Sequence, residues 1–250
     1  MSSDQSFSGR VVLVTGASRG IGEAAAFAFA KAGAEVVAVA RTLDALEALS
    51  ERASQGGGTV IPFAVDMQDV ESIERLASSL GERYGRLDVL IGSAGVLGSG
   101  SRLERIDPAV WDRTIAVNLT ANWHLIRVMH PFLMRSDAGR ALFITSGLAW
   151  RKQPLLGAYA ASKAALNALV EAYVAENVDT ALRVNLFSPG PTRTKLYAEA
   201  FPGADLESIP TPEEVAEKML EACMPTTMHN GKVYEFRDAC WKALQPPKPL

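Results

Sequence analysis

A tyrosine and a lysine, Tyr159 and Lys163, lie four residues apart at the start of a helix-forming segment. Side chains at this spacing stand on the same face of a helix. Ser146 comes thirteen residues before the tyrosine, directly after a short apolar run that is typical of a buried strand. Spacing alone also fits an ordinary surface pair. The position at the carboxyl end of a strand favours chemistry, because parallel sheets bind their ligands at that edge.

These three residue types suit proton transfer to and from a carbonyl oxygen. A free tyrosine titrates at about 10, which is too high for an efficient acid–base group at neutral pH. A neighbouring ammonium favours the phenolate, so we expect Lys163 to lower the pKa of Tyr159. Ser146 is expected to hold the substrate oxygen.

A second candidate site is the glycine-rich segment Thr15–Gly22, which lies between a β-branched run and an alanine-rich run. Its spacing is Gly-x3-Gly-x-Gly. Glycines allow a sharp turn and close approach to a pyrophosphate, and the following helix presents unpaired N–H groups. A glycine-rich turn without a ligand is the alternative.

The rest of the chain alternates strand and helix patterns. The predicted strands are 11–15, 35–40, 60–65, 87–91, 141–145, 182–187 and 232–236, and the predicted helices are 20–31, 43–54, 70–84, 108–134, 158–177 and 212–222. Parallel strands need crossover helices. The sequence therefore predicts a single-domain α/β fold, a doubly wound, Rossmann-type parallel sheet of seven strands with helices on both faces.

Length and composition agree with one folded domain. The chain has 250 residues, 48% hydrophobic and 21% charged, with a net charge of −3. We expect a polar N-terminal tail at 1–9, a dinucleotide-binding catalytic domain at 10–244 and a proline-rich tail at 245–250. The net charge argues against nucleic-acid binding, and no apolar run is long enough for a membrane span. With no signal peptide, two cysteines and no metal-ligand spacing, a cytoplasmic protein without a metal is expected.

Several separated motifs, taken in order, resemble the short-chain dehydrogenase/reductase family over nearly the whole chain. They are Thr15–Gly22, Asp66, Ser93-Ala94-Gly95, Asn118, Ser146, Tyr159-x3-Lys163 and Pro189-Gly190. The resemblance implies carbonyl–alcohol interconversion by hydride transfer, with Tyr159 as proton donor and Lys163 also bonded to the nicotinamide ribose. It implies that Asn118 binds the water of a proton relay, although a locally bonded helix amide is the alternative.

The resemblance also implies a nicotinamide dinucleotide, and the residues favour NADP. An NAD-specific protein carries an acidic residue at the end of the second strand. Here Ala40 is followed by Arg41, and Arg19 lies in the glycine loop, so two guanidinium groups are available to a 2′-phosphate. The expected cofactor-binding residues are Gly16, Ser18, Arg19, Gly20, Ile21, Gly22, Arg41, Asp66, Met67, Ser93, Ala94, Gly95, Tyr159, Lys163, Pro189, Gly190, Thr192 and Thr194.

Two segments depart from the family pattern. Gly92-Ser93 stands where the family has two asparagines, which leaves the bracing of that strand in doubt. Glu235-Phe236-Arg237 stands where the family has a glycine-rich close, so the end of the chain is expected to pack differently.

The substrate and the assembly state are less well defined by the sequence. Apolar residues at 148–156 and 196–209 favour a hydrophobic carbonyl or alcohol, whereas Arg151, Lys152 and Arg193 favour an acidic one. The apolar helices 108–134 and 158–177 resemble those that the family buries between subunits, which predicts a homodimer or homotetramer. A catalytically silent NADP(H)-binding sensor or scaffold is the alternative function.

Overall fold

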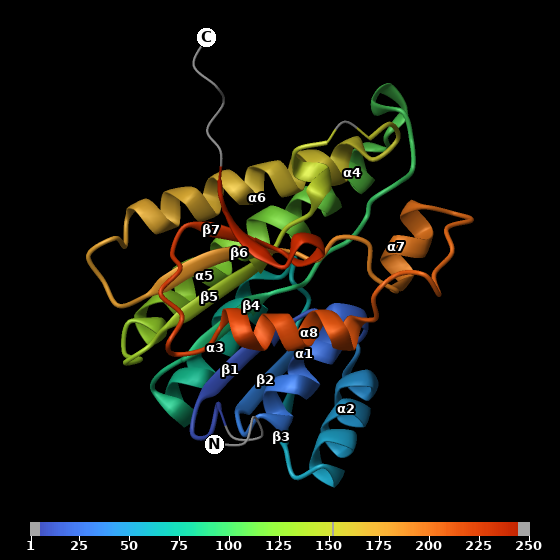
Figure 1. Ribbon diagram of the computed structural model, residues 1–250. Helices are drawn as coiled ribbons and strands as arrows, with labels where there is room; N and C mark the ends of the chain where they lie inside the picture. The colour runs from blue at the N-terminus through green and yellow to red at the C-terminus, as the bar shows by residue number, and fades with distance from the viewer. Residues whose placement is uncertain (1–5, 152, 245–250) are drawn as a thin grey trace.

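The computed structural model describes residues 6–151 and 153–244. One eight-stranded sheet runs through the molecule (Figure 1). Its strands are β1 (Val11–Thr15), β2 (Glu35–Ala40), β3 (Thr59–Ala64), β4 (Val89–Gly92), β5 (Arg140–Ile144), β6 (Arg183–Ser188), β7 (Lys232–Glu235) and β8 (Cys240–Ala243). The α-helices are α1 (Gly20–Lys31), α2 (Leu43–Gln55), α3 (Val70–Tyr84), α4 (Pro108–Ile115), α5 (Ala121–Leu133), α6 (Gly157–Ala175), α7 (Lys195–Ala200) and α8 (Pro212–Ala222).

The strand order is β3-β2-β1-β4-β5-β6-β7-β8, and every neighbouring pair is parallel except β7 and β8. The order reverses direction between β1 and β4. The loops that leave these two strands therefore diverge to opposite sides and open a crevice at the carboxyl edge of the sheet, where a doubly wound fold binds ligands.

Helices cover both faces of the sheet, as expected. On one face α1, α2 and α8 bury a core that includes Phe29, Leu46 and Met219. On the other face α3, α5 and α6 bury a core that includes Leu76, Met129 and Leu166. Strands buried on both faces read as continuous apolar runs, which explains why Val11–Thr15 is buried at all five positions.

The expectation of seven strands is wrong by one, because β8 adds an antiparallel edge strand next to β7. The expected helix 108–134 is also not a single α-helix. A π-helical segment, Ala116–Thr120, separates α4 from α5, and the Ala121 N–H bonds the Ala116 carbonyl five residues back. Single π-turns of this kind are frequent at functional sites, and this one contains Asn118.

Residues near the chain's beginning join the domain. Phe7, within the segment expected to be a polar tail, is fully buried and packs edge-on against Phe29 with ring centroids 4.9 Å apart. The expected tail 245–250 lies outside the described residues. No helix in the described part of the chain is long and apolar enough to cross a membrane.

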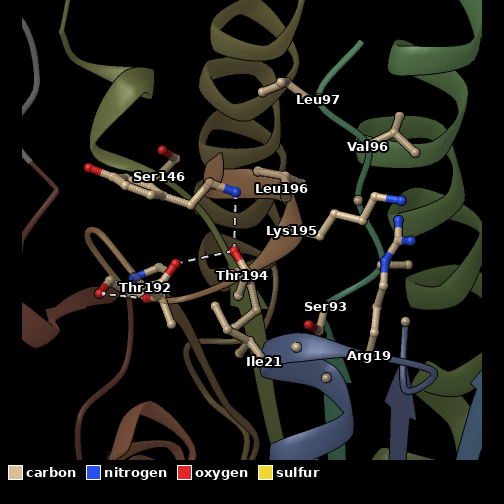
Figure 2. Close-up of a pocket in the computed structure, with 18 of the residues that line it drawn as sticks. Arg19, Ile21, Ser93, Val96, Leu97, Ser146, Thr192, Thr194, Lys195 and Leu196 are labelled. Carbon is tan, nitrogen blue, oxygen red and sulfur yellow. Dashed lines mark hydrogen bonds between the residues drawn. The ribbon is translucent and has the colours of Figure 1, made fainter. Parts of the chain in front are cut away.

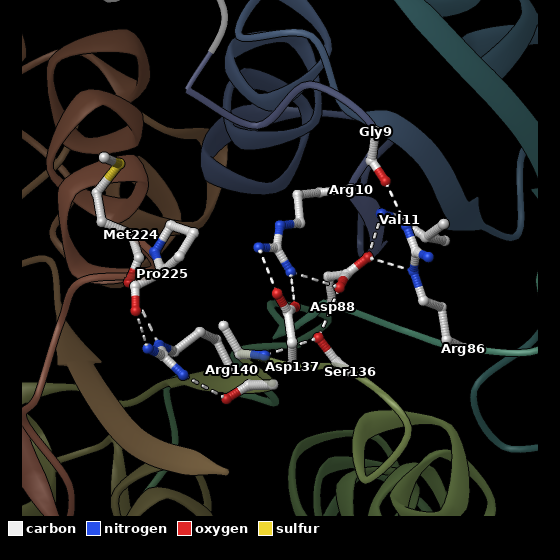
Figure 3. Close-up of polar contacts among 12 residues, drawn as sticks. Gly9, Arg10, Val11, Arg86, Asp88, Ser136, Asp137, Arg140, Met224 and Pro225 are labelled. Carbon is white, nitrogen blue, oxygen red and sulfur yellow. Dashed lines mark hydrogen bonds and ion pairs between the residues drawn. The ribbon is translucent and has the colours of Figure 1, made fainter. Parts of the chain in front are cut away.

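A polar network closes the amino-terminal edge of the sheet (Figure 3). The buried Asp88 carboxylate accepts hydrogen bonds from Arg10 at 3.0 Å, Ser136 Oγ at 2.6 Å and the Val11 N–H at 2.8 Å. Burial alone would raise the pKa of Asp88, but these donors hold it below its ordinary value. The network ties β1, β4 and β5 together at the end opposite the crevice.

Candidate active site

A cavity of about 700 Å³ opens at the carboxyl edge of the sheet. All the expected cofactor residues line it, and so do Ser146, Tyr159 and Lys163; Asn118 is the one expected site residue that does not. The fold therefore gathers loops that follow β1, β2, β3, β4, β5 and β6 around one volume. Its size is in the range of pockets that hold small molecules and cofactors.

The glycine loop forms a tight cradle at the amino end of α1. A Cβ on Gly22 would lie 2.3 Å from the Gly16 carbonyl oxygen, and a Cβ on Gly16 would lie 2.8 Å from Ala94 Cα. Gly16 also has φ +70°, which favours glycine. The residue before the helix, Arg19, makes no side-chain cap, so the first N–H groups of α1 stay available to an anion.

Tyr159 and Ser146 meet at the other end of the cavity. Ser146 lies two residues after β5, where it caps the 3-10 turn Gly147–Ala149, and Tyr159 lies in the first turn of α6. Burial raises the pKa of Tyr159 to about 12, and interaction with the Ser146 hydroxyl lowers it only in part. The expectation that Lys163 lowers this pKa is therefore wrong for this state, because the loss of hydration of the phenolate outweighs the other influences.

Lys163 is 3% exposed, and its ammonium donates a 2.7 Å hydrogen bond to the Ile144 carbonyl. The ammonium lies 5.8 Å from the Tyr159 ring centroid. Burial lowers the pKa of Lys163 to about 8, since no carboxylate among the described residues pairs with it. The lysine is thus a buried cation that titrates close to neutral pH.

The ribose-phosphate end of the cavity is cationic. Arg19 and Arg41 are both exposed and form no ion pair with a described residue. The Asp66 carboxylate accepts a hydrogen bond from the Gln68 N–H at 3.0 Å, within its own loop. No carboxylate follows directly after β2, which matches the expected arrangement for a 2′-phosphate.

The loop after β6 closes over the glycine cradle (Figure 2). Thr194 caps α7 by accepting from the Tyr197 N–H at 3.2 Å and donates to the Thr192 carbonyl at 3.2 Å. Its Cγ2 would lie 3.3 Å from a Cβ on Gly20. The six-residue helix α7, which the sequence reading missed, is therefore anchored directly above the start of α1.

The comparisons with known proteins bear on this geometry. The sequence model described as short chain dehydrogenase matches residues 10–205, more than three quarters of the chain. The chain belongs to the short-chain dehydrogenase family. It is 34% identical over 209 residues to the uncharacterized oxidoreductase YciK of Escherichia coli, covering 82% of each protein.

Solved structures of this family agree with the fold. A short-chain dehydrogenase from Pseudomonas syringae superposes with a TM-score of 0.90 at 32% identity, covering 94% of this chain and 98% of the other. One from Shigella flexneri, complexed with NADP, has a TM-score of 0.90 at 31% identity and covers 94% and 100%. The protein is therefore an oxidoreductase with the fold of this family.

The Asn118 side chain, which the family resemblance suggested as a water ligand, is hydrogen-bonded within the fold. Its Oδ1 accepts from the Val96 N–H at 2.8 Å, and its Nδ2 donates to the Val96 carbonyl and to Ser162 Oγ, both at 2.9 Å. Both amide hydrogens are thus engaged. The side chain braces the loop after β4 against α6, and the relay role stays a prediction.

Thr15 is a residue that the sequence reading used only as part of a motif. Its hydroxyl accepts from the N–H groups of Ser93 and Ala94, each at 3.1 Å, and donates to the Ile91 carbonyl at 3.3 Å. It therefore supplies the bracing that was in doubt when the two asparagines were found missing. A hydroxyl at the end of the neighbouring strand was the signal available in the sequence.

The reactive end of the cavity has apolar walls and free cations. Leu97, Leu156 and Tyr159 form a buried cluster, against which Leu148, Leu196, Ala200 and Phe201 pack. Arg193 is occupied: it donates to the Leu206 and Glu207 carbonyls and pairs with the Glu207 carboxylate at 2.8 Å. Lys152 lies outside the described residues. Arg151 lines the cavity, as does Arg237, which the sequence reading did not select.

Proposed function

We propose that the protein is an NADP(H)-dependent oxidoreductase that interconverts a carbonyl compound and an alcohol. The observation that carries this proposal is the shared cavity, which has Ser146, Tyr159 and Lys163 at one end and Arg19 and Arg41 at the other. This arrangement suits a dinucleotide that spans the cavity with its nicotinamide beside Tyr159.

The residues present fit such a cofactor. Gly16 and Gly22 leave no room for a Cβ, the first N–H groups of α1 stay available, and neither arginine has a carboxylate partner among the described residues. The NADP complex of the Shigella flexneri relative supports the same choice. Arg19 and Arg41 would bind the 2′-phosphate, and Lys163 would bind the nicotinamide ribose.

The bound cofactor supplies or accepts the hydride. In the direction of reduction, Ser146 donates a hydrogen bond to the carbonyl oxygen and the Tyr159 hydroxyl donates its proton to that oxygen. With a pKa of about 12, Tyr159 carries its proton at neutral pH, but so weak an acid needs a nearby positive charge to donate that proton. The buried, cationic Lys163 then stabilises the phenolate that remains.

Assembly as a homodimer or homotetramer belongs to the same proposal. The outer face of α6 carries exposed alanines at 161, 164, 168 and 172. On the neighbouring α5, Trp123 is 48% exposed. Exposed small and aromatic side chains on these two helices suit packing against a second copy of the chain.

The proposed function is tested by removing the Tyr159 hydroxyl. Tyr159→Phe should abolish NADPH oxidation with any carbonyl compound that the wild type reduces, with NADPH affinity nearly unchanged, because the hydroxyl acts in the transition state. Ser146→Ala should lower kcat by roughly 10²–10³. The matched control is Tyr84→Phe, since the Tyr84 hydroxyl bonds Glu35 on the surface, outside the cavity.

The outcomes separate the two functions. Retention of more than about a tenth of the activity by Tyr159→Phe would show that another group donates the proton. Tight NADPH binding by the wild type, without turnover of any compound in a broad panel of ketones and aldehydes, would favour the silent sensor.

A further inference from the structure

Two arginines from different loops line the cavity. The Arg151 guanidinium lies against the residue that follows Ser146, because a Cβ on Gly147 would be 3.8 Å from Arg151 Cζ. Arg237 comes from the short 3-10 turn Phe236–Asp238 after β7, and its Cβ would be 3.9 Å from a Cβ on Gly190. Both side chains line the cavity.

Neither guanidinium is used by the fold. No hydrogen bond or ion pair within the described residues involves the side chain of Arg151 or Arg237. The carboxylate that is influenced by both is Asp238, and Lys242 already pairs with it. The buried Arg140 guanidinium, by contrast, donates its hydrogen bonds to backbone carbonyls (Figure 3). The two cavity arginines therefore keep their hydrogen-bond donors for a ligand.

The two arginines suit an anionic ligand. Among the described residues, Glu235 also lines the cavity, and Asp238, which both arginines influence, is paired with Lys242. The buried Lys163 ammonium adds a further positive charge to the cavity wall. A carboxylate matches the planar fork of a guanidinium and can accept two parallel hydrogen bonds from it.

The body of the ligand must be apolar. Leu97, Leu196 and Ser146 lie in the upper part of the cavity in Figure 2, away from Arg19. Leu148 and Phe201 complete this wall against Tyr159. A compound whose carbonyl oxygen sits between Ser146 and Tyr159 would therefore place an aliphatic or aromatic group on the leucines and a charged group toward Arg151.

We propose that the substrates are hydrophobic oxo acids and the corresponding hydroxy acids, with the carboxylate bound by Arg151 and Arg237. This rests on the proposed function. The reaction is a two-electron reduction in which NADPH delivers hydride to the carbonyl carbon and the C=O π bond breaks. The oxygen takes the Tyr159 proton, NADP⁺ is released, and the carboxylate is unchanged.

The test compares acids with their own esters. Benzoylformate and 3-benzoylpropionate each have the same aromatic ketone as their methyl esters but carry a carboxylate. The wild type should show a kcat/KM at least tenfold higher for one of the acids than for its ester. Arg151→Gln and Arg237→Gln should each lower that acid-to-ester ratio at least fivefold. Arg83→Gln, an exposed arginine on α3 outside the cavity, should leave the ratio unchanged.

A binding measurement keeps this test independent of turnover. In the Tyr159→Phe protein saturated with NADPH, the acid should bind more tightly than the ester, and the added Arg151→Gln change should remove the difference. Equal binding of acid and ester, or a ratio that neither arginine variant moves, overturns the proposal even if ketone reduction proceeds. Activity retained by Tyr159→Phe would instead count against the catalytic proposal alone.

Discussion

The buried Lys163 ammonium should lower the free energy of unfolding, and this effect can be measured. Lys163 lies in the core of the site with a pKa lowered from 10.5 to about 8. Each pKa unit corresponds to about 1.4 kcal/mol between the two protonation states. Keeping the ammonium charged in the folded state at pH 7 therefore costs about 3 kcal/mol.

Lys163→Met removes that cost and keeps most of the side-chain volume. It also removes the hydrogen bond to Ile144, which contributes about 1 kcal/mol. We expect Lys163→Met to raise the free energy of unfolding by about 2 kcal/mol at pH 7 while abolishing turnover. The measurement is urea denaturation of the cofactor-free protein, with the exposed Lys31→Met as a control that changes stability by less than about 0.5 kcal/mol.

The sign of the pH dependence provides a second test of the same reasoning. Between pH 8 and 10.5 the unfolded wild type binds a proton at Lys163 that the folded protein has released, so wild-type stability rises relative to the variant. The advantage of Lys163→Met should shrink through this window and reverse above it, where only the lost hydrogen bond remains. A variant less stable than the wild type at pH 7, or a difference constant with pH, would refute the argument.

Two further predictions concern the cofactor and the assembly. The wild type should bind NADPH at least tenfold more tightly than NADH, about 1.4 kcal/mol, and Arg41→Asp should reverse the order in a fluorescence titration; equal affinities in the wild type would contradict the assignment of Arg19 and Arg41. At micromolar concentration the protein should sediment as a dimer or tetramer, and Ala168→Arg on the exposed face of α6 should shift it toward the monomer; a wild-type monomer would contradict the proposed interface.

The parts of the fold that the sequence predicted are those with strong local patterns. The predicted strands and most of the predicted helices lie within two residues of their observed bounds. Continuous β-branched runs and long helix-forming segments give a clear local signal of the element they form. β8 was not predicted because its local sequence pattern is weak. It has four residues, is mostly exposed, and is held by pairing with β7 and by Trp241, which stacks 4.5 Å from His229.

The π-helical segment also could not be predicted from the local sequence pattern. Its sequence, AVNLT, is compatible with an ordinary helix. Asn118 makes its hydrogen bonds to Val96 and Ser162, which lie 22 and 44 residues away. Contacts of this kind depend on the assembled fold. For the same reason the sequence selected Ser146, Tyr159 and Lys163, which the fold brings to one cavity, but predicted the wrong direction for the pKa of Tyr159, because burial is a tertiary property.

Gly92, at the end of β4, departs from the family pattern, and this departure is linked to the residues packed around it. A Cβ on Gly92 would lie 2.5 Å from Phe143 Cδ1 and 2.6 Å from Asn122 Oδ1. Asn122 is itself fixed, since its Nδ2 donates to the Asn118 carbonyl at 2.9 Å. The volume that a side chain at 92 would fill is therefore occupied by Phe143 and by an amide from α5. Because cores are close-packed, an asparagine at 92 would require both neighbours to move. Gly92 is thus one member of a packed set, and the Thr15 hydroxyl holds the following N–H groups in place.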